Sequence, residues 1–373
     1  MHHYADIATA VYRRAIVENP SQPTSPEAPA YELPGWVWII WLLNLVLFLP
    51  LILIIEYTIR QVYPVLAIVE NENPPAYEPV SLNDETASLA EDPQNGAPKP
   101  AGTNVHSGDF TVTSSLRGCH RTLRASGGFR ANFRGFYCLA AQMVMTWMLM
   151  GIFGSALGSG ASSLATLLAS LSLVQFSTAW VHIVISQPSP VRFWRRLPPF
   201  KRTFEATWRA VTLYWAAQEI TRWIPLFTGM LLGIQFTNDG TEQSSEQPDG
   251  FGWKLLTMVG VAIIPAIVLL IPAHIILVRV QASLLPEDTE TILPFDRSFE
   301  GTVEPAVVGG LGYVSMRDAW KTFSRSAWRR IVKLYIKIYA ISFAFTIVAG
   351  IVIGVQIMFI LANSSKVDNG GGQ

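Results

Sequence analysis

Two cations lie inside or at the edge of long apolar runs in this 373-residue chain. Arg222 interrupts the run from 210 to 236, and Lys337 precedes the apolar stretch near the C-terminus. A cation facing lipid is costly, so both side chains are expected to face a wet interior, where they would attract a carboxylate or a phosphate. For each cation an alternative stays open: Arg222 can pair with nearby Glu219, and Lys337 can extend to a basic membrane surface.

The remaining residues that could do chemistry form no recognisable set. His182 and His274 have no second metal ligand three or four residues away, so both are interpreted as hydrogen-bonded packing residues. The two cysteines, Cys119 and Cys138, define neither a metal site nor a disulfide framework. A hydrolase inside the membrane would need a Ser, His and Asp set or a metal. We therefore expect no enzyme, no metal, no cofactor and no nucleic-acid partner.

The composition is typical of a multi-pass membrane protein in a lipid bilayer. Half of the residues are hydrophobic and only 14% are charged. Residues 135 to 191 contain no Asp, Glu, Lys or Arg, which is long enough for two spans of about 20 residues each. Six spans are predicted in an all-α membrane domain of residues 35 to 361. Their expected bounds are about 36–59, 135–157, 161–187, 210–236, 254–279 and 333–361.

Basic residues distinguish the two sides of this predicted domain. The segments after spans one, three and five, with the adjoining helix ends, hold 22 of the 27 Lys and Arg. Positively charged segments stay on the side of synthesis. The three basic loops are therefore expected in the cytosol, or in the matrix if the membrane is the mitochondrial inner one.

Three segments are expected to lie outside the spans. Residues 1 to 34 form an N-terminal tail, whose first 19 residues could dock on the membrane as a short amphipathic helix or remain a frayed end. Residues 71 to 115 are rich in Pro, Glu, Asn, Ser and Thr and lack helical periodicity, which predicts a disordered loop. Residues 362 to 373 form a C-terminal tail. No continuous apolar core of a signal peptide is visible in the first 30 residues.

A short basic segment occurs three times, each time before an apolar run. Each copy reads Arg or Lys, Thr, then Phe or Leu, and after a few residues an aromatic residue followed by Arg. The copies are Arg121 to Arg130, Arg202 to Arg209 and Lys321 to Arg329. Three such units indicate three two-span repeats with short amphipathic surface helices, arranged around a central site.

Prolines late in the odd spans, at Pro50, Pro188 and Pro272, predict repeated kinks. At these positions the chain resembles the mitochondrial carrier family, whose odd spans end in Pro-x-Asp/Glu-x-x-Lys/Arg, commonly followed by x-Lys/Arg-x-Gln. In addition, residues 126 to 136 look like that family's Glu-Gly-x-x-x-x-aromatic-Arg-Gly segment. The resemblance covers roughly residues 36 to 361, apart from the inserted loop.

The family's odd-span motif is degenerate in this sequence. The fifth span keeps the proline, the later Arg279 and Gln281, but His274 stands for the acid and Leu277 for the base. The third span has Arg192 one position early, and the first keeps only the proline. In the family, the acid and base of each motif form interhelical ion pairs that need both partners. No position here has both, so a divergent transporter gated by other contacts and a non-transporting carrier-shaped scaffold remain open.

The resemblance also implies which residues would contact a solute. The family places substrate contacts about seven residues beyond the turn glycine of each even span, often as Arg-x-x-Pro. The matching positions are Gln142, Arg222 and Lys337, and Arg222 to Pro225 reproduces the motif. Two cations and an amide favour a small anionic solute. The resemblance thus implies a carrier-like transporter, most simply in a mitochondrial membrane.

The predicted loop carries a signal that favours a different function. Pro74, Pro75 and Tyr77 form the Pro-Pro-x-Tyr pattern that docks on WW-domain grooves. If the loop is cytosolic, the protein could recruit a WW-domain ubiquitin ligase as adaptor or client, in another organellar membrane. If the loop faces the matrix, the motif is accidental. The alternative function is therefore a non-transporting scaffold or adaptor.

Overall fold

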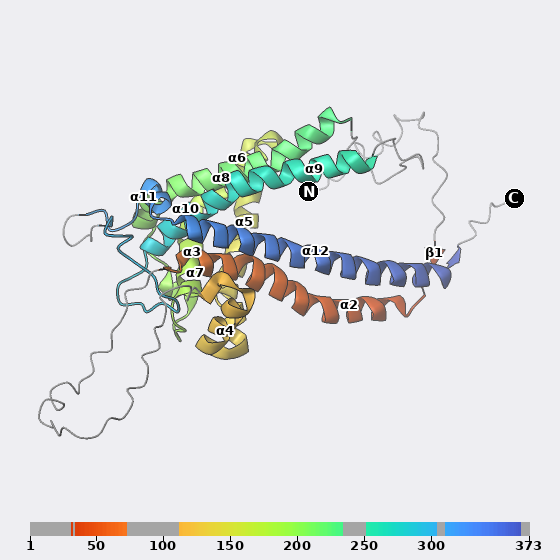
Figure 1. The fold of residues 1–373 in the computed structure, drawn as a ribbon. Coiled ribbons are helices and arrows are strands. Elements are labelled where there is room, and N and C mark those ends of the chain that lie inside the picture. The colour runs from red at the N-terminus through yellow and green to blue at the C-terminus, as the bar shows by residue number, and fades with distance from the viewer. Residues whose placement is uncertain (1–30, 33, 73–111, 234–250, 304–309, 367–373) are drawn as a thin grey trace, which may run out of the picture. The chain divides into compact units, whose positions relative to one another are not determined.

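The computed structural model of this chain describes residues 31–32, 34–72, 112–233, 251–303 and 310–366. The described residues are mostly helical (Figure 1). The chain divides into two compact units. The first unit comprises Met1–Leu51 with Phe343–Gln373, and the second comprises Ile52–Ser342.

Long helices dominate the chain order, and the strands are only two residues each. Two segments, η1 and η7, are π-helical, and η3, η4, η5 and η6 are short 3-10 helices. The elements are β1 (Tyr31–Glu32), α2 (Val37–Ile52), η1 (Leu53–Val62), α3 (Tyr63–Val69), η3 (Val112–Ser114), α4 (Leu116–Gly127), η4 (Gly128–Phe133), α5 (Phe136–Leu157), η5 (Ser159–Ala161), α6 (Ser162–Ser172), α7 (Val174–Ile185), η6 (Phe193–Arg196), α8 (Phe200–Leu231), α9 (Phe251–Pro265), η7 (Ala266–Leu270), α10 (Ile271–Ser283), α11 (Met316–Lys321), α12 (Arg325–Ala362) and β2 (Ser365–Lys366).

Four helical stretches of the described residues are long and apolar enough to cross a membrane. They are Val37–Val69, Leu116–Leu157, Gly252–Ser283 and Arg325–Ala362. Helices α6 and α7 add a fifth if the bent pair counts as one span. These helices fit an integral, multi-pass membrane protein of the all-α class. The sixth span and the three repeats stay predictions.

Helix α8, which contains the predicted span 210–236, is not among these candidates. It runs unbroken for 32 residues from Phe200. Gln218, Glu219 and Arg222 lie in its middle and lower its mean hydropathy below that of the other long helices. A helix of this kind needs protein or water around its polar residues if it lies in a membrane.

The first apolar helix continues past residue 59, where the predicted span ends, to Val69. Glu56 and Arg60 lie within it, and their side chains form an ion pair of 2.7 Å one turn apart. This pairing reduces the cost of carrying two charges in the helix. The span was predicted from an uncharged run, and Glu56 and Arg60 interrupt that run. The predicted end therefore came too early.

The predicted third span, 161–187, is bent by 59° between α6 and α7. The bend lies near Leu173, well before the kink predicted at Pro188, which lies beyond the end of α7. The hydroxyls of Ser170 and Ser172 each donate to the carbonyl four residues earlier, at 2.8 Å. Such back-bonding competes with the helical ladder and bends helices.

The two π-helical segments each lie just before or close to a proline. In η7 the N–H of Ile271, next to Pro272, bonds the carbonyl of Ala266 five residues back. Proline has no N–H and its ring clashes with the carbonyl four residues earlier, so the preceding turn widens. The same pattern occurs in η1 before Pro64. Pro50, by contrast, lies inside α2.

The three basic segments differ in structure. The first forms a separate helix, α4, followed by η4 and a turn at Gly135. The second is the beginning of α8, with no break before the apolar part. The third spans the end of α11, a turn at Thr322, and the start of α12. The first and third copies therefore have a helix, a turn and an apolar helix in succession, whereas the second copy has no turn.

The hydrophobic core of the second unit lies where α3, α7 and α10 pack together. The first turns of α12 join this cluster through Ile331, Leu334 and Ile338. All seven residues of α3 are buried. A second cluster packs α8 against α10 and includes Phe299 from the loop after α10.

In the first unit, a few side chains join α2 and the residue before it to the C-terminal part of α12. The Asn44 side chain donates to the Gln356 side chain at 2.6 Å, and Trp36 contacts Phe359 with ring centroids 5.6 Å apart. Strands β1 and β2 pair in antiparallel fashion. Most large apolar side chains of these helices are exposed, as expected for helices that lipid surrounds.

Candidate functional site

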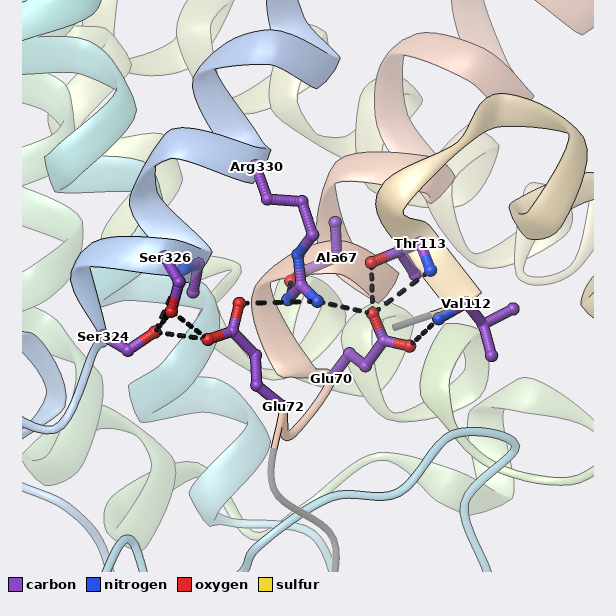
Figure 2. A network of polar contacts seen from close by, with 9 residues as sticks. Ala67, Glu70, Glu72, Val112, Thr113, Ser324, Ser326 and Arg330 are labelled. Atoms are coloured by element: carbon purple, nitrogen blue, oxygen red, sulfur yellow. Dashed lines mark hydrogen bonds and ion pairs between the residues drawn. The ribbon is translucent and has the colours of Figure 1, made fainter. Parts of the chain in front are cut away.

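A buried carboxylate joins three parts of the second unit at the end of α3 (Figure 2). The Glu70 side chain is 1% exposed and forms an ion pair of 2.9 Å with Arg330, near the start of α12. It also accepts hydrogen bonds from the backbone N–H groups of Val112, at 2.6 Å, and Thr113, at 3.2 Å. Glu70 thus holds α12 and the segment before α4 against α3.

Arg330 is almost as buried, with 8% of its side chain exposed. It also donates to the carbonyl of Ala67 at 3.1 Å and lies 3.7 Å from Glu72. Glu72 in turn accepts hydrogen bonds from the hydroxyls of Ser324 and Ser326 (Figure 2). The start of α12 is therefore held by a connected polar network rather than by one contact.

The loop after α10 packs beside this network. Asp296 accepts hydrogen bonds from the backbone N–H groups of Ser298, at 2.9 Å, and Glu300, at 2.8 Å. Phe299 and Glu300 have φ values of 50° and 58°, which side chains rarely adopt, so these bonds stabilise a strained turn. The turn buries Phe299 beneath Arg279, whose guanidinium carbon lies 4.9 Å from the ring centroid.

Acid is expected to loosen this turn. Partial burial raises the pKa of Asp296, but hydrogen bonds from Ser298 and Glu300 and the charge of Arg279 outweigh it and lower the pKa below its ordinary value. A carboxyl with a lowered pKa stabilises the fold above its unfolded pKa of about 3.9, and that stability is lost as the pH falls through the folded pKa. Between pH 5 and 3, proteolysis of the loop should therefore speed up in the wild type. Asp296→Asn should flatten this dependence, and an equal pH response in both proteins would contradict the assignment.

A cavity lies between η6, the start of α8, the end of α10 and the following loop. Its volume is about 810 Å³. Four arginines line it, with a single acid, Glu287. The four are Arg195, Arg196, Arg202 and Arg297. A cavity of this size with an excess of three positive charges suits an anion.

The cavity arginines differ in how many hydrogen bonds they already form with the protein. Arg297 donates to the carbonyls of Pro286 and Thr289, and Arg202 donates weakly, at 3.3 Å, to that of Gly312. Arg195 is exposed, and its side chain has no hydrogen bond or ion pair within the described part of the chain. It is the arginine most available to a ligand.

His182 also lines the cavity, and it is 4% exposed. Its Nε2 lies 2.9 Å from the carbonyl of Gln281, whose side-chain amide donates to Ser177 at 3.0 Å. This arrangement fits the interpretation of His182 as a hydrogen-bonded packing residue. These hydrogen bonds also connect the cavity lining at His182 to Ser177 in the middle of α7.

A second cavity, of about 460 Å³, shares Arg196 with the first. It is lined by two further arginines, Arg134 and Arg192. The guanidinium of Arg196 donates to the Ser186 hydroxyl at 2.7 Å, and burial lowers its pKa. Arg192 stacks on Trp194, with 5.1 Å from the guanidinium carbon to the ring centroid. The basic character of this end of the unit therefore extends over both cavities.

The predicted solute contacts lie on three different helices of the second unit. Gln142 is on α5, and its side-chain oxygen is buried without a hydrogen-bond partner. Arg222 is on α8, pairs with Glu219, and donates to Ser163 at 2.8 Å. Lys337 is exposed on α12. Among the described residues, no hydrogen bond or ion pair joins any two of these three side chains. The ion pair between Arg222 and Glu219 is the alternative that the sequence analysis left open for Arg222.

The remaining motif positions serve local structure. Arg279 donates to the Thr322 hydroxyl at 2.7 Å, and His274 lies 2.8 Å from the Tyr335 hydroxyl. Neither side chain forms an ion pair with an acid among the described residues. Pro74, Pro75 and Tyr77 lie outside the described residues.

The arginine-lined cavity and the Glu70 network were missed at the level of sequence. The sequence did contain an indication of the cavity, because four arginines lie within one short Pro-rich stretch: Arg192, Arg195, Arg196 and Arg202. For the second, the only hint was Glu70 itself, which follows a long apolar segment directly. Its partner Arg330 is 260 positions away, so nothing in the local pattern joins them.

The fold and these cavities define an α-helical, multi-pass membrane protein with a basic cavity at one end of its larger unit. Comparison with protein-family models, curated proteins and solved structures finds no match for this chain.

Proposed function

We propose that this protein is a transporter of a small anionic solute, and that the arginine-lined cavity is where the solute first binds. The observation that carries the proposal is the charge of that cavity: four arginines and one acid line about 810 Å³. A volume of this size admits a small organic anion rather than only an ion. Arg195 and Arg202 are exposed there and can donate several hydrogen bonds each to carboxylate or phosphate oxygens.

The membrane helices support the same proposal. Basic residues concentrated on one side of a set of apolar helices attract anions to that side before they cross. A carrier-like arrangement of six spans in three repeats, in a mitochondrial membrane, is the specific form we propose. Under it, Gln142, Arg222 and Lys337 would contact the solute deeper in the path, and Arg222 would leave Glu219 to do so.

Equilibrium binding tests the role of the cavity. Succinate and inorganic phosphate are titrated into the full-length chain in detergent, and affinity is measured by calorimetry. The double variant Arg195→Gln with Arg202→Gln is expected to bind at least about 100-fold more weakly, since each charged hydrogen bond contributes roughly 1.5–3 kcal/mol. Arg317→Gln, at an exposed arginine outside the cavity lining, is the matched control and should bind like the wild type.

Two outcomes would contradict the proposal. If neither succinate nor phosphate binds the wild type, the cavity is not an anion site. If the double variant binds with the same affinity as the wild type, the anion site lies elsewhere. Arg222→Ala tests the deeper solute contacts independently of the cavity, because Arg222 does not line the cavity. The adaptor function rests on Pro74, Pro75 and Tyr77, outside the described residues, and it stays a prediction from sequence.

A further inference from the structure

A cluster of polar side chains lies within the second unit and lines none of the cavities described above. His274 on α10 lies with its Nδ1 2.8 Å from the hydroxyl of Tyr335 on α12. Its ring centroid is 5.5 Å from that of Tyr214 on α8. Tyr335 stacks on Tyr339 at 6.3 Å, and the guanidinium carbon of Arg60 in η1 lies 5.9 Å from the Tyr339 ring centroid. Four elements therefore bring these five side chains together.

The contact with Tyr335 occupies only Nδ1 of the His274 imidazole. When the Tyr335 hydroxyl donates to Nδ1, the ring proton is on Nε2. No hydrogen bond reaches Nε2 from any of the residues that the structure describes. A polar donor inside a membrane helix bundle that lacks a protein partner is best explained by a ligand or water that accepts from it.

The backbone around the cluster is irregular in two places. Arg60 belongs to the π-helical segment η1, and the second π-helical segment, η7, ends four residues before His274. π-helical turns occur frequently at functional sites. In a membrane, irregular backbone is tolerated where it is buried in protein or lines a cavity. One segment carries Arg60, and the other leads directly into the helix that carries His274.

Polar groups continue from the arginine-lined cavity toward this cluster along α10. Ser283, which lines the cavity, is nine residues beyond His274, a distance of about 14 Å along a helix. Gln281 lies between them and bonds Ser177, and His182 bonds the Gln281 carbonyl from the cavity side. Gln281 and His182 therefore form a buried polar contact on the α10 segment that joins the cavity to His274.

We infer that His274, with Tyr214, Tyr335, Tyr339 and Arg60, forms a second anion-binding station deeper in the bundle. The inference rests on the proposed function, since the station would take the carboxylate or phosphate group that first binds the arginines. His274 Nε2–H donates to the anion, and Tyr214, whose hydroxyl is hydrogen-bonded to the Gln218 side chain, packs against the imidazole. Tyr335 is a positioning residue that fixes the imidazole tautomer. Arg60 is paired with Glu56 at 2.7 Å, so hydrogen bonds rather than net charge hold the anion.

The test is ¹⁵N NMR of the histidine side chains in the full-length chain in lipid nanodiscs. The chain has six histidines, and His274→Gln identifies the resonance of interest by its loss. Titration with succinate, and separately with inorganic phosphate, should shift the His274 Nε2 resonance saturably. Tyr335→Phe should weaken that titration about tenfold, whereas Tyr137→Phe, a 78% exposed tyrosine outside the cluster, should leave it unchanged.

The outcomes separate this inference from the proposed function. No shift with either probe overturns the station, whatever the cavity binds. An unchanged titration in folded Tyr335→Phe overturns the role of Tyr335, and unfolding of each variant in the same nanodiscs is measured as a check. If Tyr335→Phe does not fold, His274→Gln replaces it, with loss of probe affinity as the readout. The double variant Arg195→Gln with Arg202→Gln should still show the His274 shift at saturating probe, because the station is a separate site.

Discussion

Glu70→Ala is expected to lower the free energy of unfolding by about 3–5 kcal/mol. The substitution leaves the guanidinium of Arg330 buried, with only a carbonyl and the more distant Glu72 as partners. It also removes the acceptor for the N–H groups of Val112 and Thr113. A buried charge without its partner is among the most destabilising changes in a folded protein.

Equilibrium unfolding in detergent measures this effect. Asp288→Asn is a suitable control, because that carboxylate is exposed, and it should change stability by no more than about 0.5 kcal/mol. Replacing both partners, as Glu70→Leu with Arg330→Met, should recover much of the loss, since no charge is then left buried. A loss in Glu70→Ala no larger than in the control would show that the pair does not hold α12 in place.

Gly135→Ala is expected to destabilise the protein by about 2–4 kcal/mol. Gly135 has a φ of 72°, in the left-handed region that disfavours any side chain. An added Cβ would lie 2.9 Å from the Trp180 ring. That ring cannot move freely, because Trp180 is 7% exposed and its indole N–H bonds the Tyr57 hydroxyl at 3.2 Å. Strain and overpacking therefore act together.

Gly154→Ala, within the helix α5 that begins directly after Gly135, is the matched control. A Cβ there meets nothing within 4 Å, and Gly154 is in the helix interior, so alanine should be neutral or stabilise by up to about 1 kcal/mol. Unfolding of the two variants is compared under identical conditions. Equal stability of both would contradict the close approach of Gly135 to Trp180.

The helical, membrane-spanning class could be predicted from sequence because it depends on local composition. Uncharged runs such as 135–157 and 255–278 correspond to α5 and to α9 with α10. Boundaries were less predictable where charges pair within one helix, as Glu56 and Arg60 do. The turn at Gly135 was also visible, because a glycine after an aromatic residue and an arginine matched a known pattern.

The site was harder to predict because its residues come together over long separations. The cavity combines η6 with the loop after α10, and the polar cluster combines α8, α10 and α12. Motif matching suggested Arg222 as a solute contact. In the structure Arg222 forms an ion pair with Glu219, three residues earlier on the same helix. Motif matching passed over Arg195, which belongs to no motif, and it assigned Arg202 only to the second basic segment. Both line the cavity because of where η6 and α8 begin.

Uptake of labelled succinate or phosphate into proteoliposomes tests the transport of an anion most directly. Wild-type protein should give saturable uptake above that of empty liposomes, and Arg317→Gln should match it. The double variant Arg195→Gln with Arg202→Gln should lose most of the initial rate at probe concentrations below saturation, because the solute no longer binds the cavity. Uptake equal to that of empty liposomes, or equal rates in wild type and double variant, would contradict the proposed function.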